Sequence, residues 1–234
     1  MKICILIIAT NRYINFLPSL LLSIEENFLG GHEIYSLVFT NHEITHVSRN
    51  VKAFRIQHES WPAPTLKRYH YFLKEKDYIS KFDYCFYMDV DMKIVGRVGE
   101  EILGELVATQ HPGFWWKNKN LFSYERRPES TAYIPYGQGK MYYAGGFNGG
   151  KPEHFLKMSE KIASSIEDDL KKRIIAVWHD ESHLNRYLLD NPPTLELSPS
   201  YCFPEAIDYS PNIWNVPFER KILALEKKHA QVRS

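Results

Sequence analysis

Two aspartates, Asp89 and Asp91, stand directly after an apolar stretch at residues 84–88 that is typical of a buried strand. Ligands of open α/β sheets bind beyond the carboxyl ends of the strands, so polar side chains at this place can do chemistry. Two carboxylates separated only by Val90 can share a divalent cation that bridges the phosphates of a nucleotide. The alternative is a solvated turn after the strand, and the spacing alone leaves both interpretations open.

A second polar cluster occupies residues 178–183, with the sequence WHDESH. If this segment is helical, His179 and His183 lie four residues apart on one face, as in the zinc-binding helices of metallohydrolases. That pattern requires a glutamate directly after the first histidine, whereas here the glutamate is Glu181, two positions on. A second interpretation is a helix start whose carboxylates face a cleft, with Glu181 as a base, a nucleophile or a binding group. In a third, Asp180 and Glu181 only stabilise a helix N-terminus.

A glycine-rich segment, YYAGGFNGG at residues 142–150, places four glycines within nine residues. It is not a phosphate-binding loop, because no Lys-Ser/Thr pair follows it and it lacks the G-x-G-x-x-G spacing. Glycine allows a ligand to approach the backbone closely, so the segment is either a bent strand beside a bulky ligand or a structural bulge.

The basic segment 226–233, EKKHAQVR, has two interpretations. Such a segment is usually a solvated end. It can also act as a flap whose cations cover a diphosphate and neutralise its charge as it leaves.

The elements that must position these groups alternate along the chain. Short apolar runs predict strands at 3–9, 35–40, 51–57 and 84–88, and helical spacing predicts helices at 17–28 and 64–81. This order is that of an α/β domain with a mainly parallel sheet. The second half is less regular, with short strands and loops over 111–150, helices at 153–172 and 181–189, and an irregular stretch from residue 206. We expect a single domain over residues 1–234.

Composition excludes several classes of protein. Lys and Arg total 29 against 28 Asp and Glu, a net charge of +1, which argues against a nucleic-acid partner. The 44% hydrophobic and 24% charged residues are ordinary for a folded chain, and three cysteines are too few for a disulfide framework. Because no apolar run is long enough to span a bilayer, we expect a cytoplasmic protein without an anchor. The aromatic content of 14% suits stacking on sugars, so a non-catalytic glycan-binding module is one alternative.

Several long segments together resemble glycosyltransferase family 6, which includes the histo-blood-group A and B transferases and the α-1,3-galactosyltransferases. The matching segments, in the family's order, are MDVDM (88–92), ATQHPGFW (108–115), FSYERRPESTAYIP (122–135), YYAGGFNGG (142–150), AVWHDESHLNRYLL (176–189) and LSPSYC (197–202). The resemblance implies a GT-A fold with a Rossmann-like, UDP-binding half at 1–92. It assigns 93–234 to the donor sugar, the acceptor and a basic C-terminal tail. The missing anchor makes the chain similar to soluble members of bacterial or viral type.

The resemblance also implies a reaction, namely retaining transfer of galactose or N-acetylgalactosamine from a UDP-sugar, in α-1,3 linkage, to a galactose-terminated oligosaccharide. Asp89 and Asp91 match the family's manganese-binding Asp-x-Asp, with Mg²⁺ as a possible substitute, and we expect metal dependence. The other positions that match donor-binding residues are Ile8, Thr10, Tyr13, Arg68, Val90, Asp180, Lys227 and Arg233.

Glu181 matches the glutamate that the family places beneath the anomeric carbon. It would either form a covalent glycosyl-enzyme intermediate or stabilise the oxocarbenium-like transition state and hold the acceptor. His111, Ser123 and Trp178 match acceptor contacts. Glu205 is the nearest substitute for a family carboxylate that is absent here, because Pro204 stands in its place.

The triplet Ala144, Gly145 and Gly146 aligns with the residues that set the choice of donor. Glycine in the third place leaves room for an N-acetyl group, so Gly146 favours UDP-GalNAc, with UDP-Gal as the alternative. The small Ala144 enlarges the pocket without excluding galactose. A fucosylated (H-type) galactose is the first expectation for the acceptor, and lactose or N-acetyllactosamine remains open. A zinc hydrolase built on His179 and His183 is a distant alternative.

Overall fold

The computed structural model describes residues 1–44, 49–205, 219–227 and 232. Its strands are β1 (Lys2–Ile8), β2 (Glu33–Thr40), β3 (Val51–Arg55), β4 (Tyr84–Met88), β5 (Met92–Ile94), β6 (Leu106–Gln110), β7 (Tyr143–Gly150), β8 (Leu195–Leu197), β9 (Phe203–Pro204) and β10 (Ile222–Ala224). Its α-helices are α1 (Leu17–Asn27), α2 (Ala63–Leu66), α3 (Arg68–Lys74), α4 (Lys76–Ile79), α5 (Pro152–Lys171) and α6 (His179–Asp190). Short 3₁₀ helices are η1 (Asn11–Phe16), η2 (Glu100–Ile102), η3 (Lys119–Leu121) and η4 (Pro199–Tyr201).

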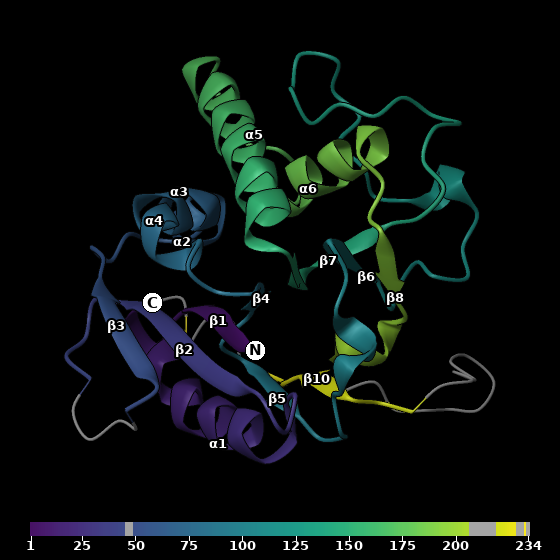
Figure 1. Ribbon diagram of the computed structural model, residues 1–234. Coiled ribbons are helices and arrows are strands. Elements are labelled where there is room, and N and C mark those ends of the chain that lie inside the picture. Colours follow the sequence, from purple (N-terminus) through teal and green to yellow (C-terminus); the bar gives the residue numbers. More distant parts are fainter. Residues whose placement is uncertain (45–48, 206–218, 228–231, 233–234) are drawn as a thin grey trace.

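The larger sheet has the strand order β3-β2-β1-β4-β7-β6-β8 (Figure 1). The four strands β3, β2, β1 and β4 are parallel to their neighbours, as the alternation of strands and helices predicts. Strand β7 then runs antiparallel to both β4 and β6, and β8 is parallel to β6. The predicted α/β fold is therefore confirmed, with a parallel first half and a mixed second half.

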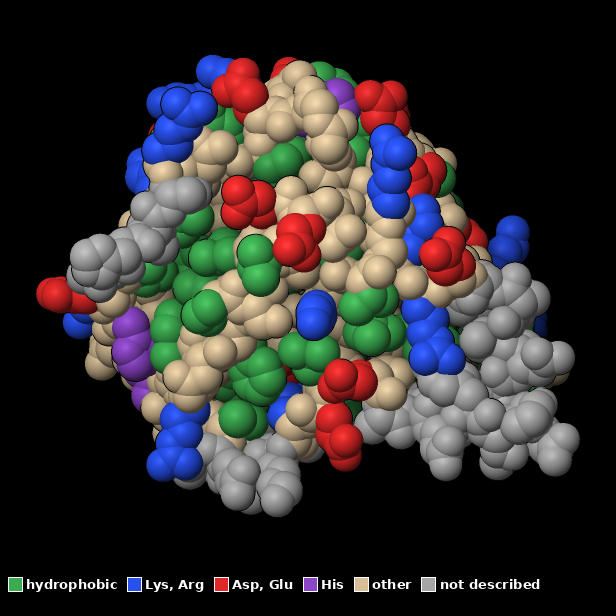
Figure 2. Space-filling view, turned by 90° about the horizontal axis from the view of Figure 1, so that it is seen from below, with side chains coloured by type: hydrophobic (Ala, Val, Ile, Leu, Met, Phe, Trp, Pro, Cys, Tyr) green, Lys and Arg blue, Asp and Glu red, His purple; other side chains and the backbone are tan. Residues whose placement is uncertain are grey.

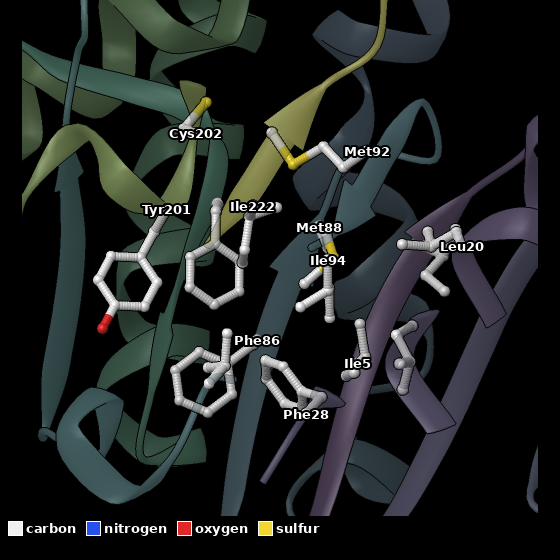
Figure 3. Packing of buried hydrophobic residues seen from close by; sticks show 14 of the residues in the cluster. Ile5, Leu20, Phe28, Phe86, Met88, Met92, Ile94, Tyr201, Cys202 and Ile222 are labelled. Carbon is white, nitrogen blue, oxygen red and sulfur yellow. The ribbon is translucent and has the colours of Figure 1, made fainter. Parts of the chain in front are cut away.

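Strand β1 shows why the parallel half of the larger sheet is apolar on both faces. Ile3, Ile5 and Ile7 pack into the core beneath α1, whereas Cys4 and Leu6 face the core under α3, α5 and α6. Side chains of a strand alternate between its two faces, so a strand covered by helices on both sides must be apolar throughout. Fully burying one such side chain stabilises the fold by about 1.5–3 kcal/mol. Figure 3 shows Ile5 of this strand within the first of these cores.

The helices agree with the predictions except at one place. α1 and α5 lie within one residue of the predicted 17–28 and 153–172, and α6 begins two residues before 181. The single helix predicted over 64–81 is wrong, because α2, α3 and α4 replace it with breaks at Lys67 and Glu75. Arg68, Tyr69, Tyr71 and Phe72 are all buried, so this segment has no single apolar stripe and tertiary packing overrides helix propensity.

A second sheet has the order β5-β10-β9 and joins distant parts of the chain. β10 is antiparallel to β5, and beyond it the Leu225 amide donates to the Asp91 carbonyl over 2.8 Å. The prediction of irregular structure from residue 206 is therefore wrong for β10, which lies beside the Asp-x-Asp segment.

The surface on the side of α1 carries a broad groove of about 830 Å³. Leu17, Leu21 and Leu22 contribute to its wall, and hydrophobic side chains gather among charged ones on this face (Figure 2). The groove shares no lining residue with the cleft described below. In the described part of the chain, no helix combines the length and the apolar character needed to cross a membrane.

Candidate active site

A cleft of about 250 Å³ opens where β1 and β4 end. These strands are parallel neighbours, so their carboxyl ends meet at one edge of the sheet, where such folds bind ligands. The cleft is lined by many residues that the sequence singles out: Ile8, Thr10, Tyr13, Arg68, Asp89, Val90, Asp91, Gly145, Gly146, Trp178, Asp180, Glu181 and Lys227. Segments far apart in the chain thus contribute to one site.

Arg68, the first residue of α3, is the central cation of the cleft. Only 5% of it is exposed. Its Nη1 donates to the Gly145 carbonyl over 2.7 Å and lies 3.2 Å from Asp180 Oδ2, and its Nη2 lies 3.2 Å from Asp89 Oδ1. Burial disfavours the charged guanidinium, but Asp180, Tyr87 and Asp89 outweigh it and leave the arginine pKa above its usual value. Arg68 therefore stays charged and holds two carboxylates and β7 together.

Glu181 lies in the first turn of α6, and both of its carboxylate oxygens accept hydrogen bonds. The Gly145 amide donates to Oε2 over 2.7 Å, and the Tyr142 hydroxyl donates to Oε1 over 2.9 Å. Burial raises the pKa of Glu181 to about 7, although these two bonds favour its charged form. Asp180 and Glu181 lie in the first turn of α6, as a helix-stabilising role predicts, but that is not their only role, because Asp180 also contacts Arg68 and Glu181 accepts the Gly145 amide.

The glycine-rich segment forms β7, and its bulge faces the cleft. Ala144 pairs with Thr109 of β6, but the next pairing joins Asn148 to Ala108, so residues 145–147 have no partner on β6. Gly145 and Gly146 of this bulge line the cleft. The structural bulge is therefore confirmed, and it is the place where the backbone reaches the cleft, whereas a bulky ligand beside it stays a prediction.

Gly146 lies in a space that is already tightly filled. A methyl group added there would collide with Met92 Cε and lie 3.1 Å from Asp89 Oδ2 and 3.2 Å from Cys202 Sγ. Ala144, the first member of the triplet, is buried in the core on the α1 side of the sheet and does not line the cleft. The pocket at Gly146 is thus limited by Met92 and Cys202 as well as by residue 146.

The two aspartates have different environments. Asp91 is 3% exposed and forms an ion pair with Lys227, so it does not belong to a solvated turn. Asp89 is partly exposed and accepts a hydrogen bond from the Tyr87 hydroxyl in addition to its contact with Arg68. Carboxylate oxygens are the ligands that Mn²⁺ and Mg²⁺ prefer, so the two residues fit such an ion by the chemistry of their donor atoms. The described residues include no group of three possible metal ligands, so water or a bound molecule would have to supply the other ligands of such an ion.

The predicted acceptor residues His111 and Ser123 are not among the residues that line the cleft. His111 Nδ1 accepts the Gly113 amide over 2.9 Å, which places the ring proton on Nε2. Burial lowers the pKa of His111 to about 4, so its ring is a neutral donor. Ser123 stands between Phe122 and Tyr124, which belong to a small buried aromatic cluster.

The remaining predicted residues lie at different places relative to the cleft. Trp178 is half exposed on the cleft wall. Glu205 does not line the cleft, and its Oε2 accepts the Glu226 amide over 2.9 Å. Arg233 falls outside the described residues.

The predicted zinc pair is wrong. His179 has a left-handed backbone, with φ 52°, and its ring lies 4.7 Å from that of Trp61. His183 is buried, with Nε2 3.7 Å from Asp169. Because the positive φ takes His179 out of the helical register, the two imidazoles face different partners.

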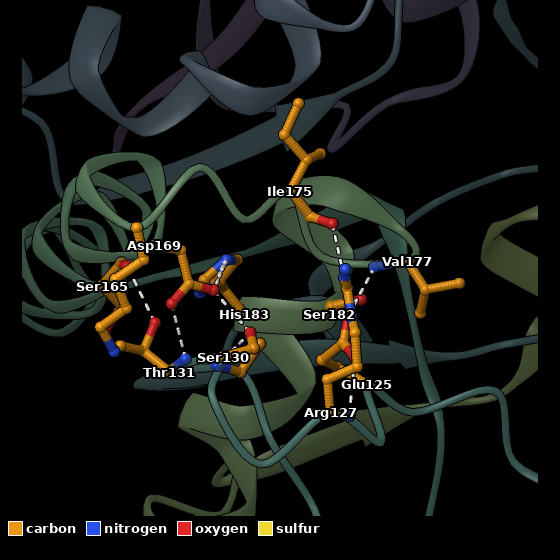
Figure 4. A network of polar contacts seen from close by, with 12 residues as sticks. Glu125, Arg127, Ser130, Thr131, Ser165, Asp169, Ile175, Val177, Ser182 and His183 are labelled. Atoms are coloured by element: carbon orange, nitrogen blue, oxygen red, sulfur yellow. Dashed lines mark hydrogen bonds and ion pairs between the residues drawn. The ribbon is translucent and has the colours of Figure 1, made fainter.

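The sequence interpretation missed two buried carboxylates: Glu125 holds the segment leading into α6, and Asp169 holds residues 130 and 131 (Figure 4). Glu125 accepts the Val177 amide over 2.8 Å and pairs with Arg127, which donates to the Ile175 carbonyl over 2.6 Å. Asp169 accepts the Ser130 hydroxyl over 2.5 Å and the Thr131 amide over 2.7 Å. No local signal marks the contact of Glu125 with Val177 or those of Asp169 with Ser130 and Thr131, because these partners are distant in the sequence.

Other cleft residues were also missed: Asn11, His58, Glu59, Trp61, Pro64, Thr65, Tyr87 and Val232. Tyr87 could have been found, because it stands two residues before Asp89, and strand residues two apart share a face.

Comparison with known proteins gives several matches. The sequence model of glycosyltransferase family 6 matches residues 1–234. Histo-blood group ABO system transferase 1 of Rattus norvegicus is 35% identical over 237 residues, covering 97% of this chain and 67% of that protein. Globoside alpha-1,3-N-acetylgalactosaminyltransferase 1 of Gallus gallus is 31% identical over 236 residues, covering 97% of this chain and 67% of that protein. The O-antigen biosynthesis glycosyltransferase WbnI of Escherichia coli is 35% identical over 209 residues, covering 88% of this chain and 89% of that protein. The family match includes every segment that lines the cleft.

Proposed function

The chain belongs to glycosyltransferase family 6, as its motifs predicted, and on that premise we propose that it transfers N-acetylgalactosamine from UDP-GalNAc to a galactose-terminated oligosaccharide. Transfer would form an α-1,3 linkage with retention at the anomeric carbon. The family supports the coarser activity, an α-1,3 glycosyltransferase. The observation that carries the proposal is the meeting of Glu181, Arg68 and the two aspartates in one cleft at the strand ends.

Glu181 is the proposed catalytic residue. Its carboxylate is held in one orientation by the Gly145 amide and the Tyr142 hydroxyl. As the bond between the anomeric carbon and the diphosphate oxygen breaks, the carboxylate can bond to that carbon or stabilise its positive charge. In both cases UDP leaves with the electron pair. The acceptor hydroxyl then bonds to the anomeric carbon, breaking the bond to Glu181 where one has formed, and its proton passes to the departing diphosphate.

Donor phosphates are proposed to bind between Asp89, Asp91 and Lys227. The two aspartates would hold Mn²⁺, or Mg²⁺ in its place, and the ion would neutralise charge on the departing diphosphate. Lys227 adds a second cation at the same edge of the cleft. Arg68 keeps Asp89 and Asp180 fixed around the donor sugar.

The choice of UDP-GalNAc over UDP-Gal is supported by Gly146, because glycine adds no side chain of its own beside Met92 and Cys202. An N-acetyl group would lie against this glycine once the flexible end of Met92 shifts. Two relatives fit this choice in part, since one is named as an N-acetylgalactosaminyltransferase and another as a blood group ABO transferase. The acceptor is proposed to be a fucosylated galactose that packs against Trp178, which is half exposed beside Glu181.

The test measures UDP release from UDP-GalNAc and from UDP-Gal, with 2′-fucosyllactose or lactose as acceptor, in Mn²⁺ and in excess EDTA. We expect turnover that depends on Mn²⁺ and favours UDP-GalNAc and the fucosylated acceptor. Faster turnover with UDP-Gal would establish the galactosyl alternative. Full activity in EDTA would refute the metal assignment, and no transfer to any galactoside would refute the proposed function.

A further inference from the structure

We propose that Tyr142 is a positioning residue for Glu181, and that its hydroxyl couples the orientation of the carboxylate to the aromatic cluster behind the acceptor side. The reaction step in this inference rests on the proposed function of Glu181. The hydrogen bond on which it depends can be tested without that function.

Tyr142 is well placed to hold Glu181. It is 1% exposed, and its hydroxyl lies 2.9 Å from Glu181 Oε1. The amide of Gly145, three residues further along, binds the other oxygen over 2.7 Å. Two donors on two oxygens fix the rotation of a carboxylate, which one donor alone does not.

Tyr142 acts as a hydrogen-bond donor over the whole working pH range. Burial, and then the nearby Glu181, raise the pKa of the tyrosine well above its usual value. A phenol that stays protonated stabilises the charged form of Glu181, and therefore lowers the pKa of a carboxyl that burial raises. The other charged groups around Glu181 are Arg68, Asp89 and Asp180.

The ring of Tyr142 is enclosed by the aromatic cluster. Its centroid lies 4.5 Å from that of Phe114, 6.1 Å from Phe122 and 5.3 Å from Tyr124, which is stacked on it. His111, one of the predicted acceptor residues, meets it edge-on at 5.5 Å. Because close-packed rings cannot shift independently, a change that displaces the ring of His111 or Phe114 also displaces the hydroxyl that holds Glu181, whereas a change that keeps every ring in place does not.

Tyr124 offers a matched control. It is buried in the same cluster and stacks on Tyr142, but its hydroxyl donates over 2.6 Å to the Met141 carbonyl instead of to Glu181. Tyr142→Phe and Tyr124→Phe each remove one buried hydroxyl and leave the ring. They differ in whether that hydroxyl touches the catalytic carboxylate.

The first experiment follows the Glu181 carboxyl by ¹³C NMR titration, with Glu181→Gln used to assign its signal. We expect Tyr142→Phe to raise the pKa of Glu181 by about one unit and Tyr124→Phe to leave it unchanged. Equal titration curves for the wild type and both variants would overturn the inference, whether or not the protein transfers sugar.

The second experiment measures transfer from UDP-GalNAc across pH. Tyr142→Phe is expected to lower kcat by roughly 10- to 100-fold with little change in donor KM, and to move the acid limb of the profile upward. In a Glu181→Gln background the same substitution should have almost no further effect, since the hydroxyl acts through that carboxylate. A similar loss of kcat in Tyr124→Phe would show that Tyr142 has only a structural role. So would an undiminished loss of kcat when Tyr142→Phe is added to Glu181→Gln. If the wild type transfers no sugar, the proposed function fails, and the titration alone decides whether Tyr142 holds Glu181.

Discussion

Strand β1 and the segment 122–134 both place side chains in the buried core, but the hydrogen bonds of their backbones are made in different ways. β1 forms hydrogen bonds with β2 and β4 along its length, and its side chains are apolar. Segment 122–134 has no helix or strand, and side chains supply several of its partners: Arg126 donates to the Ile134 carbonyl over 2.6 Å, and Asp169 accepts the Thr131 amide. Buried backbone groups must be paired, so buried polar side chains allow an irregular segment to contribute to the core. The regular region carries the proposed phosphate side of the cleft, and the irregular region supports the residues around Glu181.

The largest loss of activity is expected from a substitution of Glu181, where the two regions meet in the cleft. Glu181→Gln keeps the shape of the side chain and removes its charge, so transfer should fall by about two orders of magnitude or more, near 3 kcal/mol of barrier. The measurement is kcat with UDP-GalNAc and 2′-fucosyllactose, after a melting curve shows that the variant is folded. Near-normal turnover would exclude Glu181 as nucleophile or stabiliser.

Asp169 tests whether the irregular region depends on buried polar groups. Asp169→Ala leaves the Ser130 hydroxyl and the Thr131 amide unpaired, and should lower the free energy of unfolding by about 3 kcal/mol. In β1 the matched small change, Ile7→Val, should cost only about 1 kcal/mol. Urea unfolding measures both. If Asp169→Ala costs no more than Ile7→Val, the contrast between the two regions is wrong.

Gly146 tests the bulge of β7. Gly146→Ala should shift the ratio of kcat/KM for UDP-GalNAc to that for UDP-Gal by roughly tenfold toward UDP-Gal, because the methyl takes space from an N-acetyl group. That methyl also collides with Met92, so Gly146→Ala alone should lower the free energy of unfolding. Adding Met92→Ala should restore this stability but keep the altered donor ratio. An unchanged donor ratio in both variants would remove residue 146 from the choice of donor.

The smallest change in the rate of transfer is expected from a change of pH. Burial raises the pKa of Glu181 to about 7, and the proposed reaction needs the ionised carboxylate. Transfer should therefore fall on the acid side, reaching roughly a tenth of its maximum near pH 6. Rates measured from pH 5.5 to 8.5 at saturating substrates check this expectation. A rate that does not change between pH 6 and pH 8 would contradict the raised pKa.

The sequence predicted the regular region well because its signals are local. Apolar runs located β1 and β4, and the aspartates follow β4 within three residues. The three short helices at 63–79 could not be predicted, because buried side chains there point in several directions. The register shift of β7 and the bond between Tyr142 and Glu181, 39 residues apart, depend on tertiary pairing that no periodicity records. The same holds for Glu125, whose partner Val177 is 52 residues away.

The position of β10 between β5 and β9 has a consequence for biosynthesis. β10 is the last of the described strands to leave the ribosome, yet it pairs with β5, which is made more than a hundred residues earlier. Contacts of such long sequence separation form late, because the intervening chain must first be brought together. A nascent chain can therefore assemble β1–β4 and α1 while Asp91 still lacks Lys227 and the neighbouring strand. The edge of the cleft that is proposed to bind phosphate is completed only after residues 222–227 have been synthesised.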